Sequence, residues 1–224
     1  MIELLDVKKA FNQGRPNEFW AIRGVNLTID ANRVTVLKGP SGSGKTTLLS
    51  MIGCLSRPTE GRILFETRLL SGLPERFLTA VRRETFGFIF QQFNLIKGVT
   101  VLENVMLPAY PLGGPRRRLE ARAHTLLAQF GLEAKAGYRA EWLSGGEAQR
   151  TAICRALVND PRVLIADEPT ANLDTQLSRD FMAIVAGLKA AGKTVLLSSH
   201  DPEVYDCPAV DRVVEMRDGR LARG

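Results

Sequence analysis

The chain has 224 residues, 45% of them hydrophobic and 24% charged, which suits one large core or two fused small ones and makes a many-domain architecture unnecessary. Lysine and arginine exceed aspartate and glutamate by 30 to 24, but these charges are scattered, so we do not expect a nucleic-acid partner; the modest surplus also suits work beside an anionic membrane face. No run approaches the ~18 apolar residues of a membrane span and the first residues do not resemble a signal peptide, so we expect a cytoplasmic protein.

Apolar runs predict strands along the chain, and helical patterns lie between the later ones. The expected strands are residues 2–7, 21–29, 34–38, 62–65, 86–90, 163–166 and 194–199. Strands that alternate with helices predict an α/β fold with a mostly parallel sheet covered on both faces, whereas the closely spaced N-terminal strands predict an antiparallel β portion. From about residue 95 to 160 the pattern is almost wholly helical. We therefore expect a helical subdomain inserted between two parts of one core, residues 1–94 and 161–224.

Residues 39–46, G-P-S-G-S-G-K-T, match the phosphate-loop pattern G-x-x-x-x-G-K-[ST] between a predicted strand and a helix expected over 47–55. Its glycines let backbone amides and the positive helix end approach a polyphosphate. Lys45 is placed to reach the β and γ phosphates, and the Thr46 hydroxyl to ligate Mg²⁺. The expected ATP contacts here are Gly39, Pro40, Ser41, Gly42, Ser43, Gly44, Lys45, Thr46 and Thr47. The alternative, a glycine-rich turn without a ligand, is disfavoured by the strand and helix on either side.

A second stretch, G-L-K-A-A-G-K-T at 187–194, satisfies the same spacing in the opposite context. A helix expected over 181–191 runs into it, Gly192 suits a helix C-terminal cap, and a strand leaves it. Because no free helix N-terminus is available there, we interpret Lys193 as a surface lysine at a helix end.

Two further features have plain structural interpretations. The basic run at 116–118 is interpreted as a solvated turn before a helix that starts near Leu119. Cys54, Cys154 and Cys207 are far apart and form no Cys-x-x-Cys pair, so we interpret them as ordinary thiols of a reducing compartment.

Asp167 and Glu168 directly follow the apolar run at 163–166, which places two carboxylates at the C-terminal end of a buried strand, where ligands sit in open α/β sheets. Asp167 is suited to hold Mg²⁺ through its water shell, and Glu168 to orient and polarise the water that attacks the γ phosphate. An isolated run ending in D-E is more often a strand that enters a solvated turn. The phosphate loop ~120 residues upstream favours the catalytic interpretation.

L-S-G-G-E at 143–147 completes a set of motifs through which the chain resembles the ATP-binding subunits of ABC transporters over essentially its whole length. The resemblance implies a P-loop NTPase fold with a RecA-like core. It also implies that Ser144, Gly145, Gly146 and Glu147 start a helix and bind the γ phosphate of ATP held by the other subunit, with Ser144 as N-cap and the helix through Leu157 supplying the dipole. Ser144 and Glu147 have the spacing of a capping box as well, and both interpretations can hold at once.

The resemblance assigns three more positions. Gln91, after G-F-I-F, resembles the glutamine that contacts Mg²⁺ and links to the membrane partner, with Gln92 as its near rival. A-N-L-D at 171–174, which ends in Asp174, resembles the D-loop that crosses the dimer interface. His200 resembles the switch histidine that contacts the γ phosphate, whereas His124, on an arginine-rich helix, is interpreted as structural or exposed.

Adenine recognition rests on an aromatic face, which the family places about twenty-five positions before the phosphate loop. Phe11 is the candidate at that distance. Phe19 and Trp20 are alternatives, and any of the three could instead belong to the core.

The resemblance implies a mechanism with ATP and Mg²⁺ as cofactors and a head-to-tail homodimer that encloses two ATP molecules. Lys45 and Glu168 come from one chain and the residues from Ser144 to Gly146 from the other, so hydrolysis opens the dimer and moves an integral membrane permease docked near Gln91. Side chains that could line a docking groove, or simply pack in the core, are Phe88, Phe90, Phe93 and Leu95.

The sequence is most similar to ATPases of the lipoprotein-releasing and macrolide-exporter type, which implies a peripheral protein on the cytoplasmic face of the bacterial inner membrane. G-F-I-F-Q, L-x-E-N-V and A-D-E-P-T-A-N-L-D carry this likeness, with departures at Ala171 and around Cys154 that touch no catalytic role. Two alternatives stay open. One is a regulatory cassette that drives cell-envelope or division machinery without transport, and the other is a soluble ABC ATPase acting on DNA or ribosomes, although the coiled coils, zinc insertions and second cassettes usual there are missing.

Overall fold

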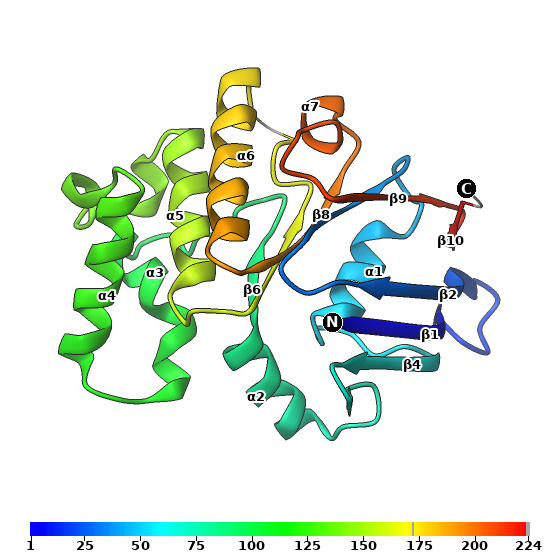
Figure 1. Ribbon diagram of the computed structural model, residues 1–224. Coiled ribbons are helices and arrows are strands. Elements are labelled where there is room, and N and C mark those ends of the chain that lie inside the picture. The colour runs from blue at the N-terminus through cyan, green and yellow to red at the C-terminus, as the bar shows by residue number, and fades with distance from the viewer. Residues whose placement is uncertain (172, 223–224) are drawn as a thin grey trace.

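The computed structural model describes residues 1–171 and 173–222, and Figure 1 shows its elements. The strands are β1 (Ile2–Phe11), β2 (Phe19–Ile29), β3 (Val34–Lys38), β4 (Glu60–Phe65), β5 (Arg68–Leu69), β6 (Phe86–Ile89), β7 (Val163–Asp167), β8 (Thr194–Ser199), β9 (Arg212–Arg217) and β10 (Arg220–Leu221). The helices are α1 (Lys45–Ile52), α2 (Glu75–Thr85), α3 (Val101–Met106), α4 (Arg116–Gln129), α5 (Gly145–Leu157), α6 (Thr175–Ala190) and α7 (Pro202–Tyr205), with 3₁₀ segments at Leu107–Leu112, Glu133–Lys135 and Ala140–Trp142.

A six-stranded sheet forms the centre of the fold in the order β10-β9-β3-β8-β7-β6. The pairings from β9 to β6 are all parallel, and the short β10 closes an antiparallel hairpin with β9. This confirms the predicted mostly parallel sheet. Strands β3 and β8 have the predicted bounds, β7 ends one residue later than predicted and β6 one residue earlier.

The two faces of this sheet pack against different layers because successive side chains of a strand point to opposite sides. Val36 and Leu197 join one core with residues of α3, α4, α5 and α6. Leu37 and Leu196 join a second core with residues of α1 and of the N-terminal strands. Burial on both faces explains why β3, β7 and β8 appear in the sequence as continuous apolar runs rather than alternating ones.

The predicted antiparallel portion is a separate four-stranded sheet in the order β2-β1-β4-β5. Ile22 of β2 and Leu48 of α1 are both fully buried in the core shared by the two sheets. Figure 1 shows α1 lying between this sheet and the central one. The position matters for function, because α1 begins at Lys45, within the phosphate-loop motif.

Helices α3, α4 and α5 lie together at the left of Figure 1, as the helical pattern of residues 95–160 predicts. The interpretation of residues 116–118 as a turn before the helix is wrong. Pro115 occupies the N-cap position and α4 begins at Arg116, whose guanidinium pairs with Glu120 one turn later at 2.7 Å. The three arginines are exposed in the first turn of the helix.

Several elements differ from the sequence-based expectation. The prediction placed no strand after residue 199, yet β9 supplies a parallel neighbour to β3. Helix α1 begins at Lys45, two residues before its predicted start, and ends before Gly53. Gly192 follows the C-cap of α6 with a φ of 76°, as its role in a helix C-terminal cap requires. Within residues 1–171 and 173–222, every helix is too short or too polar to cross a bilayer.

Candidate functional site

The site lies where the C-terminal ends of β3, β7 and β8 meet. Lys38 of β3 is in register with Ser199 of β8, and Asp167 of β7 is in register with Ser198. The segments that leave these strands therefore emerge side by side, as expected for ligand sites of parallel sheets. They carry the phosphate-loop motif, the paired carboxylates and His200.

The phosphate loop is shaped by close backbone packing. A Cβ atom at Gly39 would lie 2.2 Å from the carbonyl oxygen of Met216 in β9, and one at Gly44 would lie 2.8 Å from the carbonyl oxygen of Ala21 in β2. Gly44 is also the N-cap of α1, with a φ of 100° and no side-chain hydrogen bond to the first turn. The first amides of α1 are thus left to an external acceptor, which is the arrangement of an anion site.

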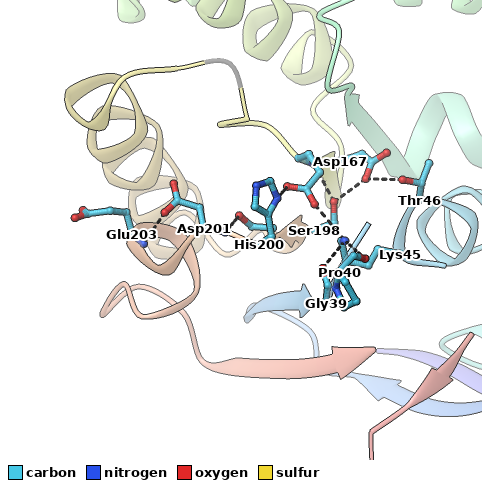
Figure 2. Close-up of polar contacts among 11 residues, drawn as sticks. Gly39, Pro40, Lys45, Thr46, Asp167, Ser198, His200, Asp201 and Glu203 are labelled. Carbon is cyan, nitrogen blue, oxygen red and sulfur yellow. Dashed lines mark hydrogen bonds and ion pairs between the residues drawn. The ribbon is translucent and has the colours of Figure 1, made fainter. Parts of the chain in front are cut away.

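Lys45 points into a polar network at this edge (Figure 2). Its ammonium donates to the carbonyl oxygens of Gly39 at 2.8 Å and Pro40 at 3.2 Å, and lies 3.3 Å from Oε1 of Glu168. The other oxygen of Glu168 lies 2.9 Å from Nδ1 of His200. The network therefore joins Lys45 to two residues, Glu168 and His200, that lie more than a hundred positions further along the chain.

The adjacent carboxylate, Asp167, is held by two hydroxyl groups. Thr46 Oγ1 donates to Asp167 Oδ1 at 3.1 Å, and Ser198 Oγ donates to the same oxygen at 2.6 Å. Ser198 Oγ also accepts from the amide of Glu168 at 2.8 Å. Glu168 has a φ of 45°, a left-handed conformation that costs about 1–3 kcal/mol in a residue with a side chain and is found at functional sites.

A pocket of about 650 Å³ opens over this network. Its lining residues are Phe11, Phe19, Trp20, Ala21, Arg23, Pro40, Ser41, Gly42, Ser43, Gly44, Lys45, Thr46, Thr47, Gln91, Glu168, His200, Asp218 and Gly219. Of the expected ATP contacts in the phosphate loop, Gly39 is not among these lining residues. Gln91 and its rival Gln92 are both exposed, but only Gln91 is among the lining residues.

The residues present fit a nucleotide polyphosphate with a divalent cation. Ser43 Oγ is buried in the loop without a hydrogen-bond partner among the described residues, so it has an unmet donor and acceptor where phosphate oxygens would lie. Thr46 and Asp167 offer one hydroxyl and one carboxylate, the hard oxygen ligands that Mg²⁺ prefers. Among the described residues, no group of three or more His, Cys, Asp or Glu side chains is placed to hold a metal ion.

All three aromatic candidates for adenine stacking lie on this pocket. The rings of Phe11 and Phe19 stack on each other with centroids 5.3 Å apart, and the two side chains are 38% and 53% exposed. Trp20 lines the same wall. Exposure on the pocket excludes a plain core position for the two phenylalanines, and the choice among the three rings stays open.

The signature segment lies at the start of α5, apart from the pocket. Ser144 is the N-cap; its hydroxyl accepts from the amide of Glu147 at 3.3 Å, and the Glu147 carboxylate accepts from the amide of Ser144 at 2.9 Å. This second hydrogen bond lowers the pKa of Glu147. The capping box is therefore present. Among the described residues, the pocket lining includes no part of 143–147.

The structure also locates Asp174, His124 and Lys193. Asp174 is the N-cap of α6 and accepts from the amide of Leu177 at 2.9 Å, but the A-N-L-D segment includes Asn172, which lies outside the described residues. His124 is exposed on α4. The second phosphate-loop match is helix, turn and strand as expected, with Lys193 paired to Asp160 at 2.7 Å.

The side chains proposed for a docking groove and the cysteines are partly accounted for by packing. Phe88 packs against the core and stacks on Phe90, with centroids 6.0 Å apart. The described structure holds its three cysteines as free thiols, and burial raises the pKa of Cys54 to about 11 and that of Cys154 to about 12. Thiols in such surroundings are inert.

Sequence reasoning missed the part of the site that the end of the β9–β10 hairpin provides. Gly219 donates its amide to the carbonyl oxygen of Ser43 at 3.1 Å and accepts from the amide of Arg23 at 2.8 Å, which ties the phosphate loop to β2. The Asp218–Gly219 pair is a hairpin-turn signal that could have revealed the turn. Nothing in the sequence marks Ser198, the hydroxyl between the two carboxylates.

Comparison with known proteins decides the family. The model of the family described as ABC transporter matches residues 22–171, a range that holds the phosphate loop, the signature segment and both carboxylates. The chain belongs to the ABC transporter family. Membership confirms the resemblance drawn from the motifs and the expected class of enzyme, an ATP-binding and ATP-hydrolysing cassette.

Curated ABC proteins match nearly the whole chain. The lipoprotein-releasing system ATP-binding protein LolD of Cereibacter sphaeroides is 43% identical over 222 residues, which cover 99% of this chain and 98% of LolD. The macrolide export ATP-binding/permease protein MacB of Rhodospirillum rubrum is 42% identical over 221 residues, which cover 99% of this chain and 34% of MacB. The chain thus spans about a third of the length of the macrolide export proteins that it matches.

Solved ABC cassettes confirm the fold class. MJ0796, described as a dimeric bacterial ABC transporter cassette, matches with a TM-score of 0.91 and 38% identity, over 100% of this chain and 97% of that one. A second structure of MJ0796, a dimeric post-hydrolysis state bound to ADP and Pi, gives the same values.

Proposed function

We propose that this chain is the ATP-hydrolysing subunit of a membrane transporter and works as a head-to-tail homodimer that encloses two ATP molecules. One observation carries the proposal. The pocket gathers Lys45, Glu168 and His200, whereas Ser144 starts a different helix outside the described pocket lining. A site that needs both sets of groups is complete only when the signature of one copy faces the pocket of another.

In the proposed site, the loop amides, Ser43 and Lys45 bind the phosphates of ATP. Lys45 is only 6% exposed, so its charge acts at low effective dielectric and attracts phosphate strongly once the contact with Glu168 is exchanged. Phe11, or one of its aromatic neighbours, stacks on the adenine. The pocket volume of about 650 Å³ lies in the range of small-molecule and cofactor sites.

The two carboxylates divide the chemistry. Thr46, Asp167 and Gln91 would hold Mg²⁺, which supplies electrostatic stabilisation of the transferring phosphoryl group when bound. Glu168 accepts a proton from, and orients, the attacking water, and His200 holds the second oxygen of Glu168 at 2.9 Å. Glu168 directly follows β7 and His200 directly follows β8, so the pairing of these two strands sets the separation of the two side chains.

The names of the relatives support a proposal for the partner and the location. LolD is an ATP-binding protein of a lipoprotein-releasing system, and MacB combines an ATP-binding part with a permease. We propose that this chain works with an integral membrane permease supplied separately, docked near Gln91, on the cytoplasmic face of the membrane. Export, lipoprotein release and mechanical signalling across the membrane are the activities that this arrangement supports.

The trapped-dimer experiment tests the proposal. Glu168→Gln removes the group that activates water but keeps the side-chain shape, so ATP turnover falls by about 100-fold or more while ATP still binds. Light scattering after gel filtration with ATP should show a shift from 24.7 kDa to twice that mass. Normal turnover by this variant would overturn the role given to Glu168.

The matched control places Ser144→Arg in the Glu168→Gln background. An arginine at the N-cap of α5 blocks the face proposed to meet ATP, and its positive charge is unfavourable at a helix N-terminus. The double variant should bind ATP like Glu168→Gln and stay at the monomer mass. A dimer that still forms would contradict the assignment of Ser144 to the opposing site.

A further inference from the structure

Strand β8 carries a buried hydroxyl that the functional assignments above leave unexplained. Its six residues, T-V-L-L-S-S, are all buried, and Ser198 is 0% exposed beside the equally buried Leu197. A buried hydroxyl without partners destabilises a fold, so buried hydroxyls are found hydrogen-bonded. The partners of Ser198 therefore indicate what it does.

Both hydrogen bonds of Ser198 go to the residues with the two carboxylates. The hydroxyl donates to Oδ1 of Asp167 at 2.6 Å and accepts from the amide of Glu168 at 2.8 Å. These use its single donor and one of its acceptor positions. Figure 2 shows Asp167 between Ser198 and Thr46, so the carboxylate is held from both sides.

The register of the sheet makes this contact a fixed one. Asp167 and Ser198 are paired residues of the parallel strands β7 and β8, and Ser198 also pairs with Leu37 of β3 on its other side. The hydroxyl is thus carried by a central strand hydrogen-bonded on both sides. A group on such an element holds its partner with little freedom, because it cannot shift without moving three strands.

The second hydrogen bond acts where the chain leaves β7. Glu168 has a φ of 45°, and its amide is the donor to Ser198. Anchoring this amide fixes the peptide plane that precedes the left-handed turn. The turn places the Glu168 carboxylate 3.3 Å from the ammonium of Lys45 and 2.9 Å from the ring of His200.

We propose that Ser198 is a positioning residue for ATP hydrolysis, whose hydroxyl sets the direction of the Asp167 carboxylate and holds the Glu168 backbone in its left-handed turn. The inference rests on the proposed function, since it takes Asp167 and Glu168 as the metal-binding and water-activating groups. Ser199, the next residue, has a different partner: its hydroxyl accepts from the amide of Asp201 at 3.0 Å, beyond His200. The two serines therefore serve different parts of the site.

A matched pair of variants isolates the hydroxyl. Ser198→Thr and Ser198→Val have nearly the same shape, and only the threonine keeps a hydroxyl. Groups that orient metal ligands typically contribute 10- to 100-fold, so we expect the kcat of the valine variant to be about 10- to 100-fold below that of the threonine variant. We also expect the valine variant to need a severalfold higher Mg²⁺ concentration, while both bind ATP equally without Mg²⁺.

A readout without nucleotide tests the geometry directly. In the nucleotide-free chain, hydrogen–deuterium exchange of the Glu168 amide, followed by NMR, should be slow in the wild type and in Ser198→Thr. The amide loses its acceptor in Ser198→Val, so its exchange should be at least about tenfold faster there. Exchange of the amides within β7, which have backbone partners in the sheet, should stay unchanged.

Thr194→Val is the control for loss of a buried hydroxyl on the same strand. Thr194 Oγ1 accepts from the amide of Asn32 at 2.9 Å at the opposite end of β8, away from the pocket. This variant should lose thermal stability comparably to Ser198→Val and keep wild-type kcat. If the added methyl group prevents both Ser198 variants from folding, Ser198→Ala compared with the wild type and with Thr194→Val carries the same test.

Equal kcat and equal Glu168 exchange in the threonine and valine variants would overturn the inference. So would a loss of kcat in Ser198→Val that Thr194→Val reproduces, because the effect would then be one of stability. Failure of the proposed function looks different: Glu168→Gln would turn over ATP normally, whatever the Ser198 variants do.

Discussion

Two helices of this chain, α1 and α5, begin inside glycine-containing motifs, and their N-termini are capped in opposite ways. Helix α1 begins at Lys45 behind Gly44, with no side-chain hydrogen bond to its first turn. Helix α5 begins at Gly145 behind Ser144, with a complete capping box. The open end of α1 needs an external anion, whereas α5 is satisfied without one. This difference supports α1, rather than α5, as the helix of the primary phosphate site in the isolated chain.

The surroundings of the two ends differ in the same direction. Ser43 and Lys45 are 3% and 6% exposed at the bottom of the pocket, whereas Ser144 and Gly145 are exposed to solvent. Low exposure strengthens electrostatic binding, and high exposure weakens it. An exposed, capped helix end becomes a strong phosphate contact only when another surface covers it, which is the situation in the proposed dimer.

The largest effect on ATP binding is expected from a substitution at the start of α1. Lys45→Ala removes the cation of the phosphate loop and leaves Glu168, only 12% exposed, without its ammonium partner. We expect ATP affinity to fall by about 100-fold or more, because charge-assisted contacts to phosphate are among the strongest in proteins. Isothermal titration with ATP and Mg²⁺ measures the loss. Affinity within a factor of three of the wild type would assign phosphate binding to other groups.

The second prediction concerns the N-cap of α5. Ser144→Ala removes the N-cap hydroxyl, which should lower the free energy of unfolding by about 1 kcal/mol, as measured by urea denaturation. It should also reduce ATPase activity by about tenfold while the ATP affinity of the monomer stays unchanged, since the pocket keeps every lining residue. An equal loss of monomer affinity would show that α5 contributes to the cis site.

The third prediction compares the aromatic side chains of the pocket as candidates for adenine stacking. Stacking on one aromatic face contributes ~1–3 kcal/mol, so Phe11→Ala should weaken ATP binding by about tenfold. Phe19→Ala should have a smaller effect, because it removes the ring that stacks on Phe11 rather than the one proposed to meet adenine. Titration of a fluorescent ATP analogue with each variant measures both. A larger loss in Phe19→Ala or Trp20→Ala would move the stacking role to that ring.

The smallest expected effect on activity belongs to a change outside both helix ends. Burial alone would raise the pKa of Asp211, but hydrogen bonds from Lys189, from the amide of Val34 and from Arg33 lower it to about 2. The side chain is 14% exposed, so Asp211→Asn should lower the free energy of unfolding at pH 7 by about 2 kcal/mol.

The pH dependence of that difference follows from the sign of the shift. A carboxyl whose pKa is lower in the folded chain stabilises the fold above its ordinary pKa near 4, and the stabilisation is lost as the pH falls through about 2. The gap in unfolding free energy between wild type and Asp211→Asn should therefore close between pH 4 and pH 2. ATP affinity at pH 7 should be equal in the two proteins. A lower ATP affinity of Asp211→Asn would show that Asp211 and its hydrogen-bond partners contribute to the nucleotide site.

The central strands were predictable because they are buried on both faces. β3 and β8 appear as short apolar runs with the bounds that the structure shows, and their parallel pairing follows from the helices between them. β9 was not predicted, because only Val214 and Met216 are buried among exposed residues such as Arg212 and Glu215. A weak alternation of this kind does not separate an edge strand from a loop.

In the candidate site, too, the sequence reveals some of the residues and not others. Lys45, Asp167 and Glu168 stand in motifs whose spacing reflects the ligand, so the sequence reveals them. Ser198 acts through tertiary contacts across strand pairs, and a serine in an apolar run has no spacing that marks it. The arginines at 116–118 show the reverse error: their charge suggested a turn, but Pro115 and the Arg116–Glu120 pair start a helix.

The hydrogen bonds of Gly219 to Ser43 and Arg23 also set an order of events during synthesis. The phosphate loop at 39–46 leaves the ribosome early, yet a support beneath it is made about 175 residues later, which takes of the order of ten seconds or more at ordinary rates of translation. Until residue 219 emerges, the loop has its sequence but lacks this anchor. A nascent chain therefore acquires its full nucleotide pocket only near the completion of this domain.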